Sequence, residues 1–398
     1  MRTLLRLLSV IFVLGTAASA QNDPMVFWSE KPREGGNSFN ETPPDHEYFQ
    51  ALANYGGEWV RLSYSKWDGQ ERDFLMGSAD GYEQLVEDDL AILIKTLDLA
   101  DQAGIKVVLT PLGLPGSRWT QNNDGKIDDR IYQDKAYWEQ SAAFWQDLVI
   151  AIDGHPAIVA YNLVNEPTPE RPAGLESSMT EEQIAEWHEV QRGTARDLFA
   201  LTSYLVAAIR EVDEATPIMV DGGFYGSANG FNHWPSGIDD DRVLYDFHMY
   251  EPWAATSNSN LKRDKPLVYP GTMEISGRTE HWDPDRIKAI IQQPLDWAEE
   301  HNIPANRIVM GEFGCMRRLE WCPDYLEDVL TAAEKLGYHW AFYSFREYSW
   351  DGMDYELGGE KVRWTFWDSP EAQKAYPRGP TPQFEPIQKR LQQNLDGQ

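Results

Sequence analysis

The sequence is poor in cysteine and in positive charge. Cys315 and Cys322 are the only cysteines in 398 residues, and 35 Lys and Arg stand against 64 Asp and Glu, a formal net charge of −29. Two cysteines are too few for a zinc site, and in an oxidising compartment such a close pair is more often a disulfide than two free thiols. The acidic balance argues against nucleic acid and anionic membranes as partners and favours a neutral or cationic ligand, although solubility in an extracytoplasmic space is the better explanation of the charge.

After the N-terminus, the sequence has no uninterrupted apolar run of membrane length. Residues 1–20 carry two arginines, an apolar stretch over 7–14 and small residues up to Ala20. This order is typical of a secretory signal peptide that is cleaved before Gln21, and the apolar stretch is too short to span a membrane. We therefore expect a soluble protein that is secreted or periplasmic.

The chain also lacks Ser/Gly-rich or Pro/Thr-rich linkers, low-complexity tracts and short repeats. Nothing in its composition divides residues 21–398, and barrel domains commonly reach this length. We expect one catalytic domain over residues 21–398, present as a monomer.

Helical and strand-like segments alternate along this domain. Helical periodicity indicates helices in 85–104, 137–152, 284–302, 324–337 and 382–395, and one long helical region from Thr180 to about Val212. Apolar runs indicate strands in 58–64, 105–113, 157–167, 216–223, 242–252, 307–314 and 339–347, with a weaker strand within 26–39. About eight such strands separated by helices predict an α/β fold, a (β/α)8 TIM barrel. A doubly wound open sheet is the alternative, but no Gly-rich phosphate motif follows any strand.

Two glutamates come at the ends of apolar strands. Glu166 closes "AYNLVNEP" and Glu312 lies in "VMGEFG". A carboxylate is costly to bury, so both should face a ligand or solvent at the barrel face where strand ends converge. Glycoside hydrolysis needs such a pair, one protonated to release the leaving oxygen and one ionised to attack the anomeric carbon or to position water.

Other polar and aromatic residues belong to the same predicted site. Arg61 would favour ionised Glu312 through its charge and Tyr250 through a hydrogen bond, while Asn165 is suited to bind a sugar hydroxyl and His248 precedes Tyr250 at a strand end. Aromatic rings hold the apolar faces of sugars, so Trp253 and Trp350 are candidates for a glycan cleft, with loop packing as the equal alternative.

Competing motifs are weaker. Residues 122–129, "NNDGKIDD", are similar to a calcium loop, but aligning Gly125 as the loop glycine places Thr120 first and Ile131 last, neither of which is a good ligand. An acidic surface turn is the better interpretation, and we expect neither a metal nor a cofactor. A serine hydrolase is unsupported because no G-x-S-x-G occurs. His155, before Pro156, is interpreted as structural.

Taken together, "VRLS" at 60–63, "NLVNEP", "HMY" at 248–250 and "GEFG" at 311–314, in this order, resemble glycoside hydrolase family 5. The resemblance spans nearly the whole mature chain and implies a retaining mechanism with a covalent glycosyl-enzyme intermediate. It implies these roles: Arg61 near the nucleophile, Asn165 beside the acid/base Glu166, the sixth-strand pair His248 and Tyr250, and the nucleophile Glu312.

Two positions depart from the family pattern. Leu112 occupies the apparent place of a third-strand His, and Tyr343 the place of an eighth-strand Trp platform, so both are expected to alter the sugar subsites. We expect a hydrolase of β-glycosidic bonds, acting on a carbohydrate and endoglucanase-like. A β-mannan hydrolase is the first alternative. A glycan-binding barrel without activity is the second, but it would be expected to have lost one of the two glutamates.

Overall fold

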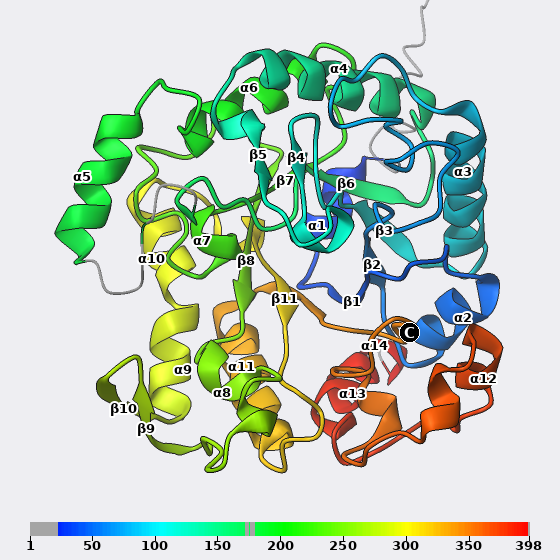
Figure 1. The fold of residues 1–398 in the computed structure, drawn as a ribbon, viewed down its shortest axis with the longest axis vertical. Helices are drawn as coiled ribbons and strands as arrows, with labels where there is room; N and C mark the ends of the chain where they lie inside the picture. Colours follow the sequence, from blue (N-terminus) through cyan, green and yellow to red (C-terminus); the bar gives the residue numbers. More distant parts are fainter. Residues whose placement is uncertain (1–22, 172–174, 176–179, 397–398) are drawn as a thin grey trace, which may run out of the picture.

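In a computed structural model that describes residues 23–171, 175 and 180–396, the chain folds into a closed barrel (Figure 1). The strands around the barrel are β1 (Glu34–Ser38), β12 (His339–Phe342), β11 (Ile308–Phe313), β8 (Val243–Met249), β7 (Ile218–Asp221), β6 (Ile158–Asn162), β3 (Lys106–Leu109) and β2 (Trp59–Leu62). Neighbouring strands pair in parallel, and β1 closes the barrel by pairing with both β2 and β12. The predicted TIM barrel is confirmed.

The long helices of the ring surround the strands because each of them buries an apolar face against the barrel (Figure 1). In α3 (Glu87–Gln102) this face is formed by Leu93, Leu97 and Ala100, which are fully buried at helical spacing. The other long helices of the ring are α4 (Ala136–Ala151), α6 (Leu198–Arg210), α9 (Pro284–Ile291), α10 (Gln293–Glu300) and α11 (Cys322–Leu336). Shorter or peripheral helices are α2 (His46–Asn54), α5 (Glu181–Gln191), α7 (Gly223–Gly226), α8 (Trp253–Thr256), α12 (Pro370–Lys374), α13 (Glu385–Leu391) and α14 (Gln393–Asp396).

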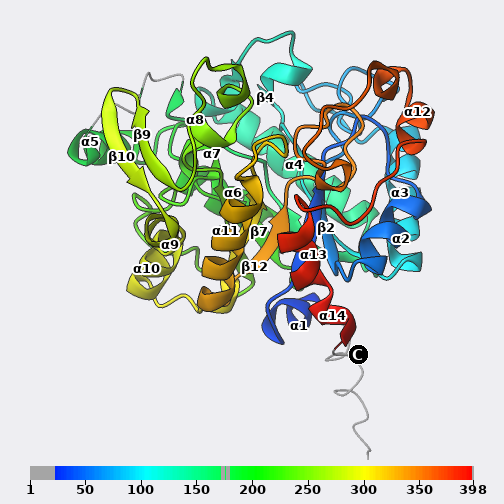
Figure 2. The same ribbon diagram turned by 90° about the horizontal axis from the view of Figure 1, so that it is seen from below.

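A short N-terminal helix, α1 (Pro24–Ser29), covers the end of the barrel opposite to α8 and α12 (Figure 2). Its Trp28 is fully buried, contacts Trp59 edge-to-face at 5.3 Å between ring centroids, and donates a hydrogen bond to the Val159 carbonyl at 2.9 Å. Trp28 therefore joins the apolar core inside the barrel to the helix outside it.

The structure corrects several predicted boundaries. Residues 24–29 form a helix rather than part of a strand, because Asp23 caps it and Pro24 occupies its first turn, where no backbone donor is needed. The long helix predicted from Thr180 ends at Gln191, and α6 begins only after Asp197, which caps it, since Gly193 between them has a left-handed φ of 71°. Two hairpins escaped prediction, β4 (Ser117–Arg118) with β5 (Asp128–Asp129) and β9 (Gly271–Ile275) with β10 (Arg278–Trp282).

The acidic segment 122–129 belongs to the first of these hairpins. Lys126 and Ile127 at its tip are exposed, and the carboxylate of Asp128 lies 3.1 Å from Arg118 Nη1 and 2.7 Å from Arg130 Nη2. Arginine side chains therefore balance the charge of Asp128. The predicted signal peptide lies outside the described residues, and within them no helix is both long and apolar enough to cross a bilayer.

Candidate active site

The polar residues singled out in the sequence come together at the carboxyl ends of the strands. Arg61, His248 and Glu312 belong to β2, β8 and β11, Tyr250 follows β8 directly, and Glu166 follows β6 within four residues. Parallel strands end on one face of a barrel, so residues far apart in the chain meet there.

Glu312 lies in the centre of this group, and its side chain is almost fully buried. Its Oε1 accepts a hydrogen bond from Arg61 Nη1 at 2.6 Å, and its Oε2 accepts one from the Tyr250 hydroxyl at 2.9 Å. The pairing of β11 with β8 shifts register between Met310 and Glu312, and the Gly311 amide donates to Asp246 Oδ1 at 2.6 Å. A side chain at Gly311 would collide with that carboxylate, so the glycine allows the bulge that directs Glu312 inward.

Burial and charge oppose each other at Glu312. Burial raises the pKa of its carboxyl group above the ordinary value, whereas the positive charges of His248 and Arg61 and the Tyr250 hydrogen bond act to lower it. The net direction is upward. The two hydrogen bonds still favour the ionised carboxylate, because both point at oxygens that carry its charge.

Glu166 is held differently. Its Oε1 lies 2.9 Å from His248 Nδ1, and its backbone N–H donates to Asp221 Oδ2 at 2.9 Å. The residue has a φ of 47°, in the left-handed region that residues other than glycine rarely adopt. The fold therefore imposes an unfavourable backbone conformation on Glu166 and stabilises it through Asp221.

His248 lies between the two glutamates. One oxygen from each and a His248 nitrogen all lie within 4.8 Å of one another. Burial lowers the pKa of His248, but the carboxylates of Glu312, Asp246 and Glu166 outweigh it and hold the pKa well above 6.5. The carboxyl groups around His248 therefore favour the protonated form of its imidazole.

Three buried polar residues beneath these side chains were missed by the sequence analysis. Asn162 Oδ1 accepts from Arg61 Nη2 at 2.7 Å, and Asn162 Nδ2 donates to Asp221 Oδ1 at 2.6 Å. Asp246, also buried, lies 3.5 Å from Arg61 Nε. A polar residue inside each of the apolar runs "AIVAYNLV", "PIMVDG" and "VLYDFHM" was the available signal.

These carboxylates and His248 do not suit a metal ion. Asp221, Asp246 and His248 also place ligand atoms within 4.8 Å of one another. However, the Arg61 guanidinium already lies within salt-bridge distance of Asp221, Asp246 and Glu312. It supplies the positive charge that these buried carboxylates need, and a second cation would be repelled.

Asn165 and the aromatic candidates differ in how far they are buried and in which side chains they contact. Asn165 is buried, and its Oδ1 has no hydrogen-bond partner among the described residues. The Tyr343 hydroxyl donates to Glu347 at 2.7 Å, and its ring lies 6.0 Å from that of Trp350. Trp253 is 62% exposed and contacts the Tyr250 ring edge-to-face at 5.7 Å.

Leu112 is buried near the end of β3, and its backbone N–H donates to Ser65 Oγ at 2.9 Å. Its side chain offers no hydrogen bond at the place where the family pattern has a histidine. A sugar hydroxyl near Leu112 would therefore have to find another partner.

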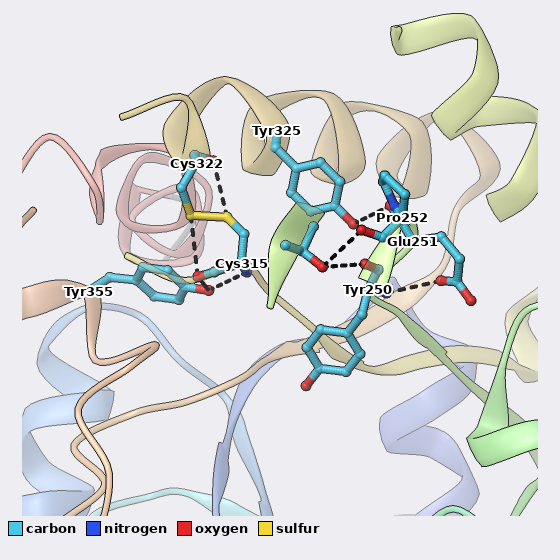
Figure 3. The surroundings of a disulfide bond; sticks show 8 residues. Tyr250, Glu251, Pro252, Cys315, Cys322, Tyr325 and Tyr355 are labelled. Carbon is cyan, nitrogen blue, oxygen red and sulfur yellow. Dashed lines mark hydrogen bonds between the residues drawn. A yellow bond between two sulfur atoms is a disulfide. The ribbon is translucent and has the colours of Figure 1, made fainter. Parts of the chain in front are cut away.

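A disulfide joins Cys315, two residues after the end of β11, to Cys322, the first residue of α11 (Figure 3). The neighbouring Met316 amide donates to the Thr256 carbonyl at 2.8 Å, and the Thr256 hydroxyl donates to the Tyr250 carbonyl. Tyr325 of α11 donates to the Glu251 carbonyl at 2.9 Å. The loop after β11 thus supports the backbone that carries Tyr250.

Comparison with known proteins gives a consistent result. The family model described as cellulase, glycosyl hydrolase family 5, matches residues 21–349. Endoglucanase C of Acetivibrio thermocellus is 22% identical over 336 residues, covering 78% of this chain and 85% of its own. Cellodextrinase A of Ruminococcus flavefaciens is 22% identical over 317 residues, covering 79% and 77%.

Among solved structures, endoglucanase Cel5A of Pseudomonas stutzeri superimposes with a TM-score of 0.59 at 21% identity, covering 90% of this chain and 94% of its own. A hyperthermophilic endo-beta-1,4-glucanase in complex with substrate gives a TM-score of 0.61 at 16% identity, covering 92% and 99%. At these identities the structural likeness supports the barrel fold, while the family match covers most of the chain. The protein is therefore an O-glycosyl hydrolase that belongs to glycosyl hydrolase family 5.

Proposed function

We propose that this protein is an exported, retaining β-glucan hydrolase with an endoglucanase-like action. The observation that carries the proposal is the spacing of Glu166 and Glu312, which have oxygens within 4.8 Å of one another. Retaining glycosidases hold their two carboxyl groups about 5–5.5 Å apart, whereas inverting enzymes need about 6.5–9.5 Å to admit water.

In the first step, Glu166 gives its proton to the glycosidic oxygen as the bond to the anomeric carbon breaks. A Glu312 oxygen attacks that carbon from the opposite face and forms a glycosyl ester. In the second step, Glu166 takes a proton from water, the water oxygen attacks the anomeric carbon, and Glu312 leaves as a carboxylate. Two inversions return the product to its original β configuration.

The surrounding residues serve these steps. Arg61 and Tyr250 each donate to a Glu312 oxygen, which keeps the carboxylate oriented for attack and stabilises it when it leaves. His248 orients the Glu166 carboxyl through its Nδ1. Asn165, with a side-chain oxygen free of other partners among the described residues, is available for a sugar hydroxyl.

The choice of a β-glucan rests on the relatives. Those compared above are named endoglucanases and a cellodextrinase, and two related structures contain cellobiose. Incubation of the enzyme with a panel of β-glucans and β-mannans, with product sizes resolved, identifies the polysaccharide and the mode of cleavage.

The mechanism is tested with Glu166→Ala and Glu312→Ala. Glu312→Ala is expected to be inactive on every substrate because no nucleophile remains. Glu166→Ala should lose about 10²–10⁴-fold on natural glycans, as expected for a missing general acid, but much less on aryl glycosides whose leaving group needs no proton. Azide should rescue Glu166→Ala and yield a β-glycosyl azide.

Proton NMR of the first product formed by the unmodified enzyme supplies the decisive measurement. A β anomer is expected. An α anomer appearing first, or equal losses for both variants on the aryl glycoside, would refute the retaining assignment.

We also propose that residues 1–20 are removed on export and that residues 21–398 form the mature enzyme. The proposal is supported by the order of residues at the N-terminus, where two arginines, an apolar stretch and small residues occur as in secretory signal peptides. Intact mass of the exported protein should correspond to a chain that begins at Gln21, and retention of Met1 would contradict it.

A further inference from the structure

Two tryptophans outside the catalytic centre are exposed on one short helix. The 3₁₀ helix η8 (Trp364–Trp367) carries Trp364, which is 77% exposed, and Trp367, which is 47% exposed. In a 3₁₀ helix, residues three apart lie on the same face, with a rise of about 6 Å between them. The two indoles, which we call the tryptophan pair, therefore project from the same side of η8.

The exposure of the tryptophan pair does not reflect a poorly packed segment. Phe366, on the opposite side of the helix, is fully buried, and its ring lies 5.2 Å from that of Tyr376. Thr365 Oγ1 and the Tyr376 hydroxyl are hydrogen-bonded at 2.6 Å. Because η8 is anchored from beneath, its two largest side chains are held at the surface, where contiguous apolar area commonly marks a binding site.

Tyr376, which anchors η8 through Thr365 and Phe366, also lines a polar hollow. It has a volume of about 200 Å³, and its lining includes Tyr376 together with charged side chains from three segments of the chain. Each of the cations pairs with a carboxylate: Lys374 with Asp45 at 2.8 Å, Arg378 with Asp354 at 3.0 Å and Arg346 with Glu356 at 2.6 Å. The hollow thus presents donors and acceptors together without a strong net charge.

We propose that the tryptophan pair and the adjoining hollow form a second carbohydrate-binding site for a neutral β-glycan chain. Successive sugar rings present apolar faces that stack on indole rings, and their hydroxyl groups need both donors and acceptors. The choice of glycan rests on the proposed function, since the ligand is the polymer that the catalytic site cleaves.

The position of the site fits this role. The helix η8 packs against α12, and both lie in the long connection between β12 and α13. Figure 2 shows α12 at the same end of the barrel as α8 and β4, opposite to α1. A polymer held there lies on the catalytic face of the molecule.

Charge argues against the other possible occupants. The whole chain carries a net charge of −29, which repels nucleic acid, anionic membranes and a second copy of the same chain. A neutral polyhydroxyl ligand does not meet that repulsion.

The test uses affinity electrophoresis of the full-length mature protein in gels that contain a soluble β-glucan. All proteins carry Glu312→Gln, so that cleavage does not change the gel during the run. Trp364→Ala with Trp367→Ala should weaken retention about tenfold, the combined loss expected for two aromatic stacking contacts. Tyr204→Ala, which removes an exposed aromatic ring from α6, is the matched control and should be retained normally.

Hydrolysis of a short aryl β-cellobioside by the same variants with Glu312 intact gives the second readout. It should be unchanged, because the tryptophan pair lies outside the catalytic centre. Unchanged retention of the double variant, loss of short-substrate hydrolysis, or tryptophan-dependent self-association in light scattering would each overturn the proposal. Retention that depends on the pair in a protein that cleaves no β-glycan would support the binding site while refuting the proposed function.

Discussion

Asp221 occupies a key position beneath the proposed acid/base. It accepts hydrogen bonds from the Glu166 backbone at 2.9 Å and from Asn162 at 2.6 Å. Burial raises its pKa to about 6, although Arg61 acts to lower it. Because the backbone of Glu166 has an unfavourable φ, a partner that fixes its N–H also fixes the direction of its carboxyl group, the proposed acid/base.

We therefore expect Asp221→Asn to lower kcat by about 10- to 100-fold, corresponding to the ~1.5–3 kcal/mol of a hydrogen bond to a charged group, with little change in KM. The matched control is Asp213→Asn, since Asp213 is a buried carboxylate bonded to Thr216 and Tyr161 away from the site. Steady-state kinetics on one soluble substrate decide the matter. Equal kcat for Asp221→Asn and the unmodified enzyme would show that Asp221 has no positioning role.

The site residues that could be predicted most readily from the sequence were charged residues in an otherwise apolar segment. Glu166 and Glu312 were visible because a charge ending an apolar strand needs a physical reason. Asp221 and Asp246 carry the same signal, yet their partners depend on strand register and on the bulge at Gly311, which no local pattern encodes.

At the scale of elements, the loop between β11 and α11 links the proposed nucleophile to its hydrogen-bond donor. The Cys315–Cys322 disulfide spans this loop with a Cα–Cα distance of 5.8 Å, and the Met316 amide connects it to Thr256 and so to Tyr250. The disulfide therefore restrains a segment that follows β11 directly and is linked through Thr256 to the residue after β8.

Replacing both cysteines by serine should lower the free energy of unfolding by about 2–3 kcal/mol, as expected for so short a closed loop. It should also lower kcat, because the Tyr250 backbone loses part of its support. Denaturant titration and kinetics measure the two effects, with each single Cys→Ser variant as a control. Two alkylatable thiols in the non-reduced exported protein would contradict the disulfide itself.

The periodicity of apolar residues predicted which segments are helices and which are strands, but it did not predict where one helix ends and the next begins. The apolar stripe of 85–104 gave α3 to within a few residues, but the break between α5 and α6 depends on Gly193 and the Asp197 cap within a continuous helical pattern. The strands of the β4–β5 hairpin are only two residues long, and those of the β9–β10 hairpin each bury a single residue, so alternation of apolar residues could not reveal them.

At the scale of the whole molecule, Trp28 of α1, which precedes the strand–helix repeat, closes the end of the barrel opposite to α8 and α12. Trp28 of α1 contacts Trp59 and His339 at ring distances of 5.3 and 4.9 Å. Strand β1, which follows α1, is the first strand of the barrel and closes it by pairing with both β2 and the last strand, β12. The N-terminal segment therefore contributes to closure of the entire domain.

Trp28→Ala should destabilise the protein by about 3–5 kcal/mol, the usual cost of removing a buried tryptophan, while leaving KM unchanged because the catalytic face is distant. Met25→Ala, in the same helix but only partly buried, should cost much less. Equilibrium denaturation compares them. Equal stabilities would show that α1 is not part of the cooperative core.

The molecule should also be more stable in mild acid than in mild base. Burial raises the pKa of Glu34 from 4.5 to about 8, with the charges of Glu334 and Glu58 adding to the effect. The folded state therefore binds a proton that the unfolded state releases between these values, so stability present at lower pH is lost as pH rises toward 8. Burial acts in the same direction on Glu170, with a pKa of about 7.

Melting temperature should accordingly fall between pH 5 and pH 8, and Glu34→Gln should flatten part of that dependence because its amide does not titrate. Glu139→Gln, an exposed position on α4, should leave the slope unchanged. A melting temperature that rises over this range would contradict the inference.

The left-handed backbone of Glu166 has a consequence for the evolution and engineering of this enzyme. Glycine tolerates a φ of 47° without strain, so replacing Glu166 by glycine would relieve a local conformational cost while removing the proposed proton donor. At this position, the substitution that increases stability is therefore expected to remove turnover. A library screened only for heat resistance would tend to enrich inactive clones there, so selection for stable variants must be coupled to a test of turnover.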